Sequence, residues 1–282
     1  MRQKISEKNN ERKIDFKAEY LRLEKCISGT ALIIQDNPTK HFSIEEYIQQ
    51  KCFNDWDLRH TFINIRELRE EYGIDRNLLN SVNYIPEYAF LDYIQFVANC
   101  VQRVEETILL NDKLKIVENG QYEVISDNIN IILKKMNCEL VFEESSGECY
   151  IIYCDEVAEI VASNNISISE SISKYRRIDS KGDLIVKGDI LRRLSLDIEN
   201  IRATTKGTQY MKLLDDTTFL LNKAGIRHSI DNSKANQIFR DMEDSEREKW
   251  FDRAFQSVIA CFAVNNYLEF SSEIDDVKKG EV

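Results

Sequence analysis

The chain has 282 residues, of which 43% are hydrophobic and 31% charged, enough apolar content for a packed core in one large or two modest domains. Nine glycines and two prolines are few for this length, which argues against a turn-rich all-β protein and favours helices. The net charge of -11 argues against a general nucleic-acid coat protein.

Several other classes of protein are disfavoured by missing sequence features. The polar start, MRQKISEKNNERK, lacks the apolar core of a secretory signal, and no segment reaches the roughly 18 apolar residues of a membrane span. The seven cysteines are scattered without a Cys-x-x-Cys pair, so we expect no metal site. No phosphate-binding glycine loop or nucleophile elbow occurs. We therefore expect a reduced, cytoplasmic protein without a cofactor and without membrane contact.

Apolar residues at helical spacing dominate the first half of the chain. A Ser43-x-x-Glu46 capping box opens one helix, Gly73 is a suitable stop for the next, and Pro86 fits the first position of the following one. The predicted helices cover residues 15–28, 43–52, 58–72, 86–108 and 122–135.

The period then changes to that of β-strands. Residues 138–144 and 148–154 are runs rich in β-branched and aromatic side chains, and Ser145-Ser-Gly147 separates them. This pattern predicts a β-hairpin. Because a lone two-stranded hairpin is only marginally stable, we expect it to pack against helices.

The second half is again helical. Asp155 is expected to cap a short helix, and the small polar stretch 163–169 suggests a boundary between a domain of residues 1–165 and a bundle of residues 166–282, although it could equally be a loop within one domain. Capping boxes at Ser167-x-x-Glu170 and Ser245-x-x-Glu248 open two of the bundle helices. Between them, Ile185 is among the predicted inward-facing residues of one helix, and Phe219 is among the apolar residues of the next. The predicted fold is mainly α, with an up-and-down C-terminal bundle.

The stretch LLNKAGIRHSIDN, from Leu220 to Asn232, gathers polar side chains at a predicted helix end. Histidine moves protons near neutral pH, and arginine binds phosphate with two parallel hydrogen bonds. RNA supplies its own 2′-hydroxyl nucleophile, so Asn222, Arg227 and His228 could support RNA cleavage without a metal. The alternative is an ordinary helix terminus, in which Gly225 stops the helix and the cations satisfy its last carbonyls.

A local basic segment surrounds this stretch. Between Ile166 and Ile230, twelve lysines and arginines face eight acidic residues. These cations predict contacts with a phosphate backbone, although charge runs often form only a solvated helix face. The candidate phosphate-binding residues are Lys223, Arg176, Arg177, Arg192 and Arg193.

A helical bundle ending in NKAGIRHSIDN resembles the HEPN domains of bacterial abortive-infection (Abi-type) antiphage and toxin proteins. The resemblance covers roughly residues 166–267 and rests on a short motif, an arginine often followed by a polar residue, then a histidine after four to six residues. It implies a metal-independent ribonuclease that acts as a homodimer, with His228 as acid and base and Asn222 and Arg227 on phosphate or ribose. RNA and a partner protein of a defence or toxin–antitoxin system are the implied partners.

One position departs from the family pattern. With six intervening residues, the family arginine falls at Leu221, which cannot hold a phosphate. Either Arg227 or Lys223 substitutes for it, or the domain is not a nuclease. The alternative that the resemblance implies is a catalytically inactive HEPN-like module for protein interaction or regulation.

Overall fold

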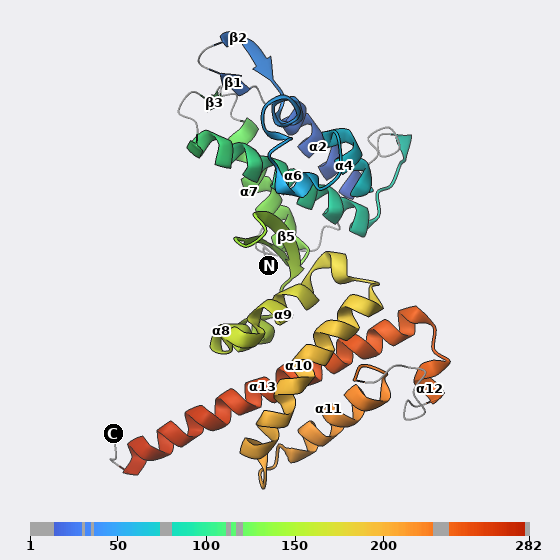
Figure 1. Cartoon of the computed structure of the whole chain (residues 1–282), viewed down its shortest axis with the longest axis vertical. Coiled ribbons are helices and arrows are strands. Elements are labelled where there is room, and N and C mark those ends of the chain that lie inside the picture. The colour runs from blue at the N-terminus through green and yellow to red at the C-terminus, as the bar shows by residue number, and fades with distance from the viewer. Residues whose placement is uncertain are drawn as a thin grey trace, which may run out of the picture. The chain divides into compact units, whose positions relative to one another are not determined.

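The computed structural model describes residues 14–29, 32–34, 37–73, 81–110, 114–116, 121–227 and 237–279 (Figure 1). The fold is mainly α-helical, as predicted. The chain divides into two compact units, residues 1–153 and 154–282. This division comes before the predicted boundary at residue 165, because helix α8 (Glu156–Asn164) packs against α9 (Ile166–Arg176) and α13 (Asp244–Lys279) of the second unit.

The first unit is built around one long helix. Helix α6 (Glu87–Leu110) follows Pro86 and buries Phe90, Ile94 and Val97. The predicted capping box is present, since Ser43 and Glu46 exchange side-chain and backbone hydrogen bonds. The other helical elements are α2 (Phe16–Gly29), α3 (Ile44–Tyr47), the π-helix η1 (Ile48–Cys52), the 3-10 helix η2 (Asp57–Arg59), α4 (Ile65–Glu71) and α7 (Gln121–Lys135).

Helix α4 begins later than the predicted residue 58. Asn64 has an extended backbone, and its side chain accepts a hydrogen bond from the Glu67 N–H, so it acts as the N-cap. The chain before it forms the separate turn η2, which buries Leu58. An internal cap that the periodicity did not reveal therefore splits the predicted helix.

A buried cation joins three helices of this unit. Arg69 of α4 forms ion pairs with Glu24 of α2, at 2.5 Å, and with Glu45 of α3. Its guanidinium lies 5.8 Å from the centre of the Phe96 ring of α6. Burial by itself lowers the pKa of Arg69, but the two carboxylates outweigh it and raise this pKa above its ordinary value.

The described strands form two antiparallel sheets. The predicted hairpin is confirmed as β4 (Cys138–Glu143) and β5 (Glu148–Tyr153), with Gly147 at a φ of 68° in the turn. A second sheet of β1 (Leu32–Ile34), β2 (Asn37–Phe42) and β3 (Leu114–Ile116), in the order β2-β1-β3, was not predicted.

Two buried amides fix the hairpin to α6, which confirms that it packs against a helix. Gln95 Oε1 accepts a hydrogen bond from the N–H of Ile151 at 2.9 Å. Asn99 accepts from the N–H of Cys149 at 2.8 Å and donates to the carbonyl of the same residue at 3.0 Å. Residues four apart share one face of a helix, so Gln95 and Asn99 reach neighbouring positions of β5.

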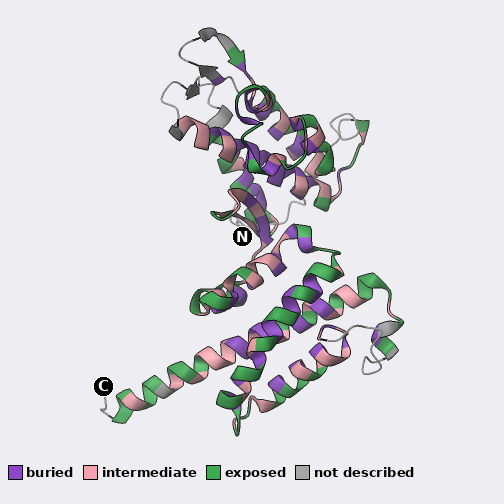
Figure 2. Ribbon diagram, in the orientation of Figure 1, coloured by how far each residue is buried: buried purple, intermediate pink, exposed green. Residues whose placement is uncertain are grey.

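The second unit is a helical bundle in which α13 packs along α8, α10 and α11. Figure 2 shows the buried positions of these helices on the sides that face one another. Asp155 caps α8 as predicted, through its contact with the Ala158 N–H. The remaining elements are the 3-10 helix η3 (Ile178–Ser180), α10 (Leu184–Thr205), α11 (Met211–Lys223) and α12 (Gln237–Arg240).

Two predicted details of α9 and α10 are wrong, and one apolar residue of α11 faces solvent. Helix α9 starts at Ile166, so Ser167 and Glu170 lie within it and form no capping box. Ile185 is exposed in the first turn of α10, next to the N-cap Asp183. Phe219 is exposed because the buried row of α11 consists of Leu214, Thr217 and Leu221, and Phe219 lies about 140° from Leu214 around the axis.

In the described part of the chain, no helix is both long enough and apolar enough to cross a membrane.

Candidate functional site

Helix α11 ends within the stretch that the sequence singled out. Asn222 and Lys223 occupy its last turn and are half-buried. Gly225 has a φ of 77°, the left-handed conformation that terminates helices. His228 and the rest of this stretch lie outside the described residues. The described part therefore has the geometry of a helix stop, and it does not place the predicted acid–base residue.

The residues on either side of Gly225 are packed into the bundle. Leu221, where the resemblance to HEPN domains would place an arginine, is fully buried, and so is Ile226. The carbonyl of Leu221 accepts a hydrogen bond from the Arg227 N–H at 3.2 Å. An apolar contact across a left-handed glycine commonly accompanies such a helix end. Leu221 thus belongs to the core of the bundle.

The Arg227 side chain folds back onto α10. Its Nη1 forms an ion pair with Glu199 at 2.9 Å, and its Nη2 donates to the Ser195 carbonyl at 2.7 Å. Arg192, seven residues or about two turns before Glu199 on α10, donates from Nε to the Ile226 carbonyl at 3.1 Å. Two of the predicted phosphate-binding arginines therefore meet at this loop, where they bind protein groups.

The other predicted basic residues separate into different surroundings. Arg176 is buried and pairs with Glu159 of α8 at 2.6 Å. Arg177 and Arg193 both lower the pKa of Glu170, although the hydrogen bond from Lys174 is the largest cause of that shift. Arg176 and Arg192 therefore bind protein groups, whereas Arg177 and Arg193 add only minor contributions to the lowered pKa of Glu170.

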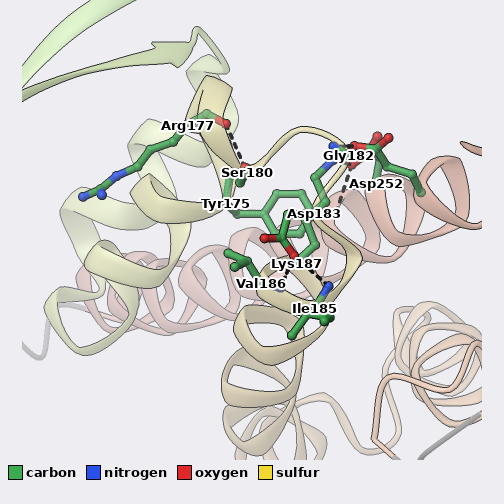
Figure 3. Close-up of polar contacts among 10 residues, drawn as sticks. Tyr175, Arg177, Ser180, Gly182, Asp183, Ile185, Val186, Lys187 and Asp252 are labelled. Atoms are coloured by element: carbon green, nitrogen blue, oxygen red, sulfur yellow. Dashed lines mark hydrogen bonds and ion pairs between the residues drawn. The ribbon is translucent and has the colours of Figure 1, made fainter. Parts of the chain in front are cut away.

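A buried polar cluster, which the sequence did not indicate, lies where α9 and α10 meet α13. Lys187 of α10 is buried and donates to Glu248 and to Asp252 of α13, each at 2.7 Å. Tyr175 of α9 donates its hydroxyl to Asp252 at 3.0 Å, and the Lys187 ammonium lies 5.2 Å from the centre of the Tyr175 ring. Figure 3 shows Lys187 and Tyr175 directed toward Asp252, with the Arg177 side chain pointing away.

Glu248 was predicted to form a capping box with Ser245, but in the structure it makes tertiary contacts. Its carboxylate accepts from Lys187 and, at 2.6 Å, from the N–H of Gly182 in the turn before α10. Burial by itself raises the pKa of Glu248, but these hydrogen bonds and the charges of Lys187 and Lys181 lower it below its ordinary value of 4.5. Glu248 thereby holds the turn against α13.

The chemistry of this cluster favours a structural role. Burial, and then the negative charge of Asp252, raise the pKa of Tyr175, so its phenol stays protonated near neutral pH. The same ring stacks on Phe255 with 4.0 Å between ring centres. One signal could have revealed the cluster: Lys187 precedes Ile190 and Leu194 at helical spacing and so lies on the apolar face of α10.

Among the residues that the structure describes, no three His, Cys, Asp or Glu side chains converge as metal ligands would. No family model, no curated protein and no solved structure matches this chain. The functional assignment therefore depends on the chemistry of the candidate residues and on the resemblance noted in the sequence.

Proposed function

We propose that this protein is an interaction or regulatory component of the abortive-infection type, and that its second unit is a HEPN-like bundle that does not cleave RNA. The observation that carries this proposal is that residues of the candidate site make structural contacts within the bundle. Leu221 stands where an arginine is expected and is buried, and Arg227 is bound to Glu199 and to the Ser195 carbonyl.

The contacts of Arg227 bear directly on phosphate binding. Two of the five N–H donors of this guanidinium already bind Glu199 and the Ser195 carbonyl, so a phosphodiester would have to share the guanidinium with them. It would also approach the negative charge of Glu199, which repels a phosphate. Arg192 is engaged in a similar way, because Asp189 at 2.5 Å and the Ile226 carbonyl bind two of its donors. Both arginines are better suited to holding the loop than to holding RNA.

Metal-independent RNA cleavage by His228, with Arg227 and Asn222, is the second candidate function. One observation favours it: Glu199 is about half exposed, so its ion pair with Arg227 can open toward solvent. A homodimer that places two such sites in one cleft would then bind RNA, as the resemblance implies.

An RNA-cleavage assay in the presence of a chelator, paired with a growth-toxicity assay, separates the two functions. The variants are His228→Ala and Glu199→Gln, which removes the carboxylate that competes for Arg227. His41→Ala, at an exposed histidine of the first unit, is the matched control. We expect no cleavage that depends on His228, and no gain with Glu199→Gln. Cleavage that His228→Ala abolishes and Glu199→Gln increases would overturn the proposal and establish the nuclease.

A further inference from the structure

The last part of α13, residues 267–279, extends beyond the rest of the bundle and is called the C-terminal arm (Figure 1). Just before the arm, Asn265 accepts a hydrogen bond from Thr204, at 2.7 Å, and Asn266 accepts one from Asn165, at 3.3 Å. At its first residue, the Tyr267 ring contacts that of Tyr210. Further along, the hydrogen bonds and ion pairs found among the described residues join α13 only to itself.

An exposed apolar row runs along the arm. Its residues are 37% to 62% exposed and follow one another at intervals of three, four and three. This is the spacing of the a and d positions of a coiled coil. The row consists of Tyr267 (a), Phe270 (d), Ile274 (a) and Val277 (d).

The exposed row is not a continuation of the face through which α13 packs against its own bundle. Each helical residue advances by about 100°, which places the centre of the arm's row about 110° around the axis from the buried row upstream. That upstream row includes Phe255, Val258 and Phe262. From Phe270 onward the arm therefore has an apolar face of its own, distinct from the face that packs in the bundle core.

The charges beside the row complement those of a second copy. With these a and d positions, Glu273 occupies a g position and Lys278 the e position five residues later. In a parallel coiled coil, a g residue of one helix faces the following e residue of the other. In an antiparallel pair, e faces e and g faces g, so neither Glu273 nor Lys278 would meet its opposite charge.

We propose that two copies of this chain associate through a parallel, two-stranded coiled coil of their C-terminal arms. Glu273 of each copy pairs with Lys278 of the other, and the four apolar residues of each arm form the seam. This interface lies on the arm and not at the end of α11, and it does not depend on whether the second unit cleaves RNA. Two heptads bury little surface, so the dimer is weak and depends on protein concentration.

Sedimentation of the full-length protein over a concentration series tests the seam. We expect the wild type to shift from monomer to dimer, and the double variant Phe270→Ser with Ile274→Ser to stay monomeric. Both side chains are exposed in the monomer, so the fold should remain intact. Leu196→Ser, an exposed leucine of α10, is the control and should dimerise like the wild type. A wild type that stays monomeric throughout, or a seam variant that dimerises normally, overturns the proposal.

Charge reversal tests the parallel orientation. Glu273→Lys alone and Lys278→Glu alone each place like charges opposite one another and should weaken the dimer several-fold. The two single variants should pair when mixed, and the double variant should dimerise like the wild type. Glu269→Lys makes the same charge change on the outer side of the arm and should have little effect. If the double variant stays as weak as the single ones, the parallel arrangement is excluded.

Discussion

Each unit of this protein buries a cation against two carboxylates from other helices, yet the two clusters differ in how far they are closed to water. Arg69 and Lys187 are almost equally buried. The carboxylates of Glu24 and Glu45 in the first unit are only 12% and 20% exposed, whereas that of Asp252 in the second is 47% exposed.

This difference determines what the loss of each cation should cost. A carboxylate that stays buried after its partner is removed has neither a counter-charge nor water, and its desolvation penalty is then felt in full. Asp252 can turn to solvent, and it keeps the hydroxyl of Tyr175 as a donor. The first cluster should therefore be essential to its unit, and the second should tolerate substitution better.

The largest effect is expected for Arg69→Ala. It leaves two shielded carboxylates without a counter-charge, so the free energy of unfolding of the first unit should fall by about 3–5 kcal/mol. Arg66→Ala, on the same helix but in an exposed pair with Glu70, should change it by less than about 0.5 kcal/mol. The chain has two tryptophans, Trp56 in the first unit and Trp250 in the second, so urea unfolding followed by fluorescence in a Trp250→Phe background reports on the first unit.

A smaller effect is expected for Lys187→Ala. The free energy of unfolding of the second unit should fall by about 2 kcal/mol, because only Glu248 remains shielded after the lysine is removed. Trp250 fluorescence in a Trp56→Phe background measures it, with Lys174→Ala as control, because Lys174 is partly exposed in a surface pair with Glu170. A loss of stability as large as that of Arg69→Ala would show that the exposure of Asp252 does not reduce the cost of removing the lysine.

The smallest effect concerns pH. Because the folded protein lowers the pKa of Glu248 below 4.5, its carboxylate contributes stability above that pH, and this contribution is lost as the pH falls further. The melting temperature of Glu248→Gln should therefore lie below that of the wild type at neutral pH and approach it as the pH falls below 4.5. A difference that persists unchanged into the acidic range would mean that the charge of Glu248 contributes nothing.

The local features of the fold could be predicted from the sequence. The capping box at Ser43, the N-cap at Asp155, the hairpin around Gly147 and the helix stop at Gly225 each depend on residues close together in the chain. Their signals are complete within a few positions, so no knowledge of the tertiary structure is needed to interpret them.

The features that join distant segments could not be predicted in the same way. Strands β1 and β3 are three residues long and pair Leu32 with Ile116, so neither has a pattern of its own. Glu248 has the spacing of a capping box but binds Lys187 and Gly182. Arg227 was predicted to bind phosphate because arginine suits it, but the Glu199 and Ser195 contacts come from another helix. The role of His228 remains a prediction.

The two amides of α6 have a consequence for the hairpin's outer edge. A two-stranded sheet exposes backbone donors and acceptors on both sides, and these can pair with a strand of another molecule. On β5, the N–H groups of Cys149 and Ile151 and the carbonyl of Cys149 are already bonded to Asn99 and Gln95. Side chains of α6 here take the place of a neighbouring strand, so these positions of β5 are not available to pair with a strand of another molecule.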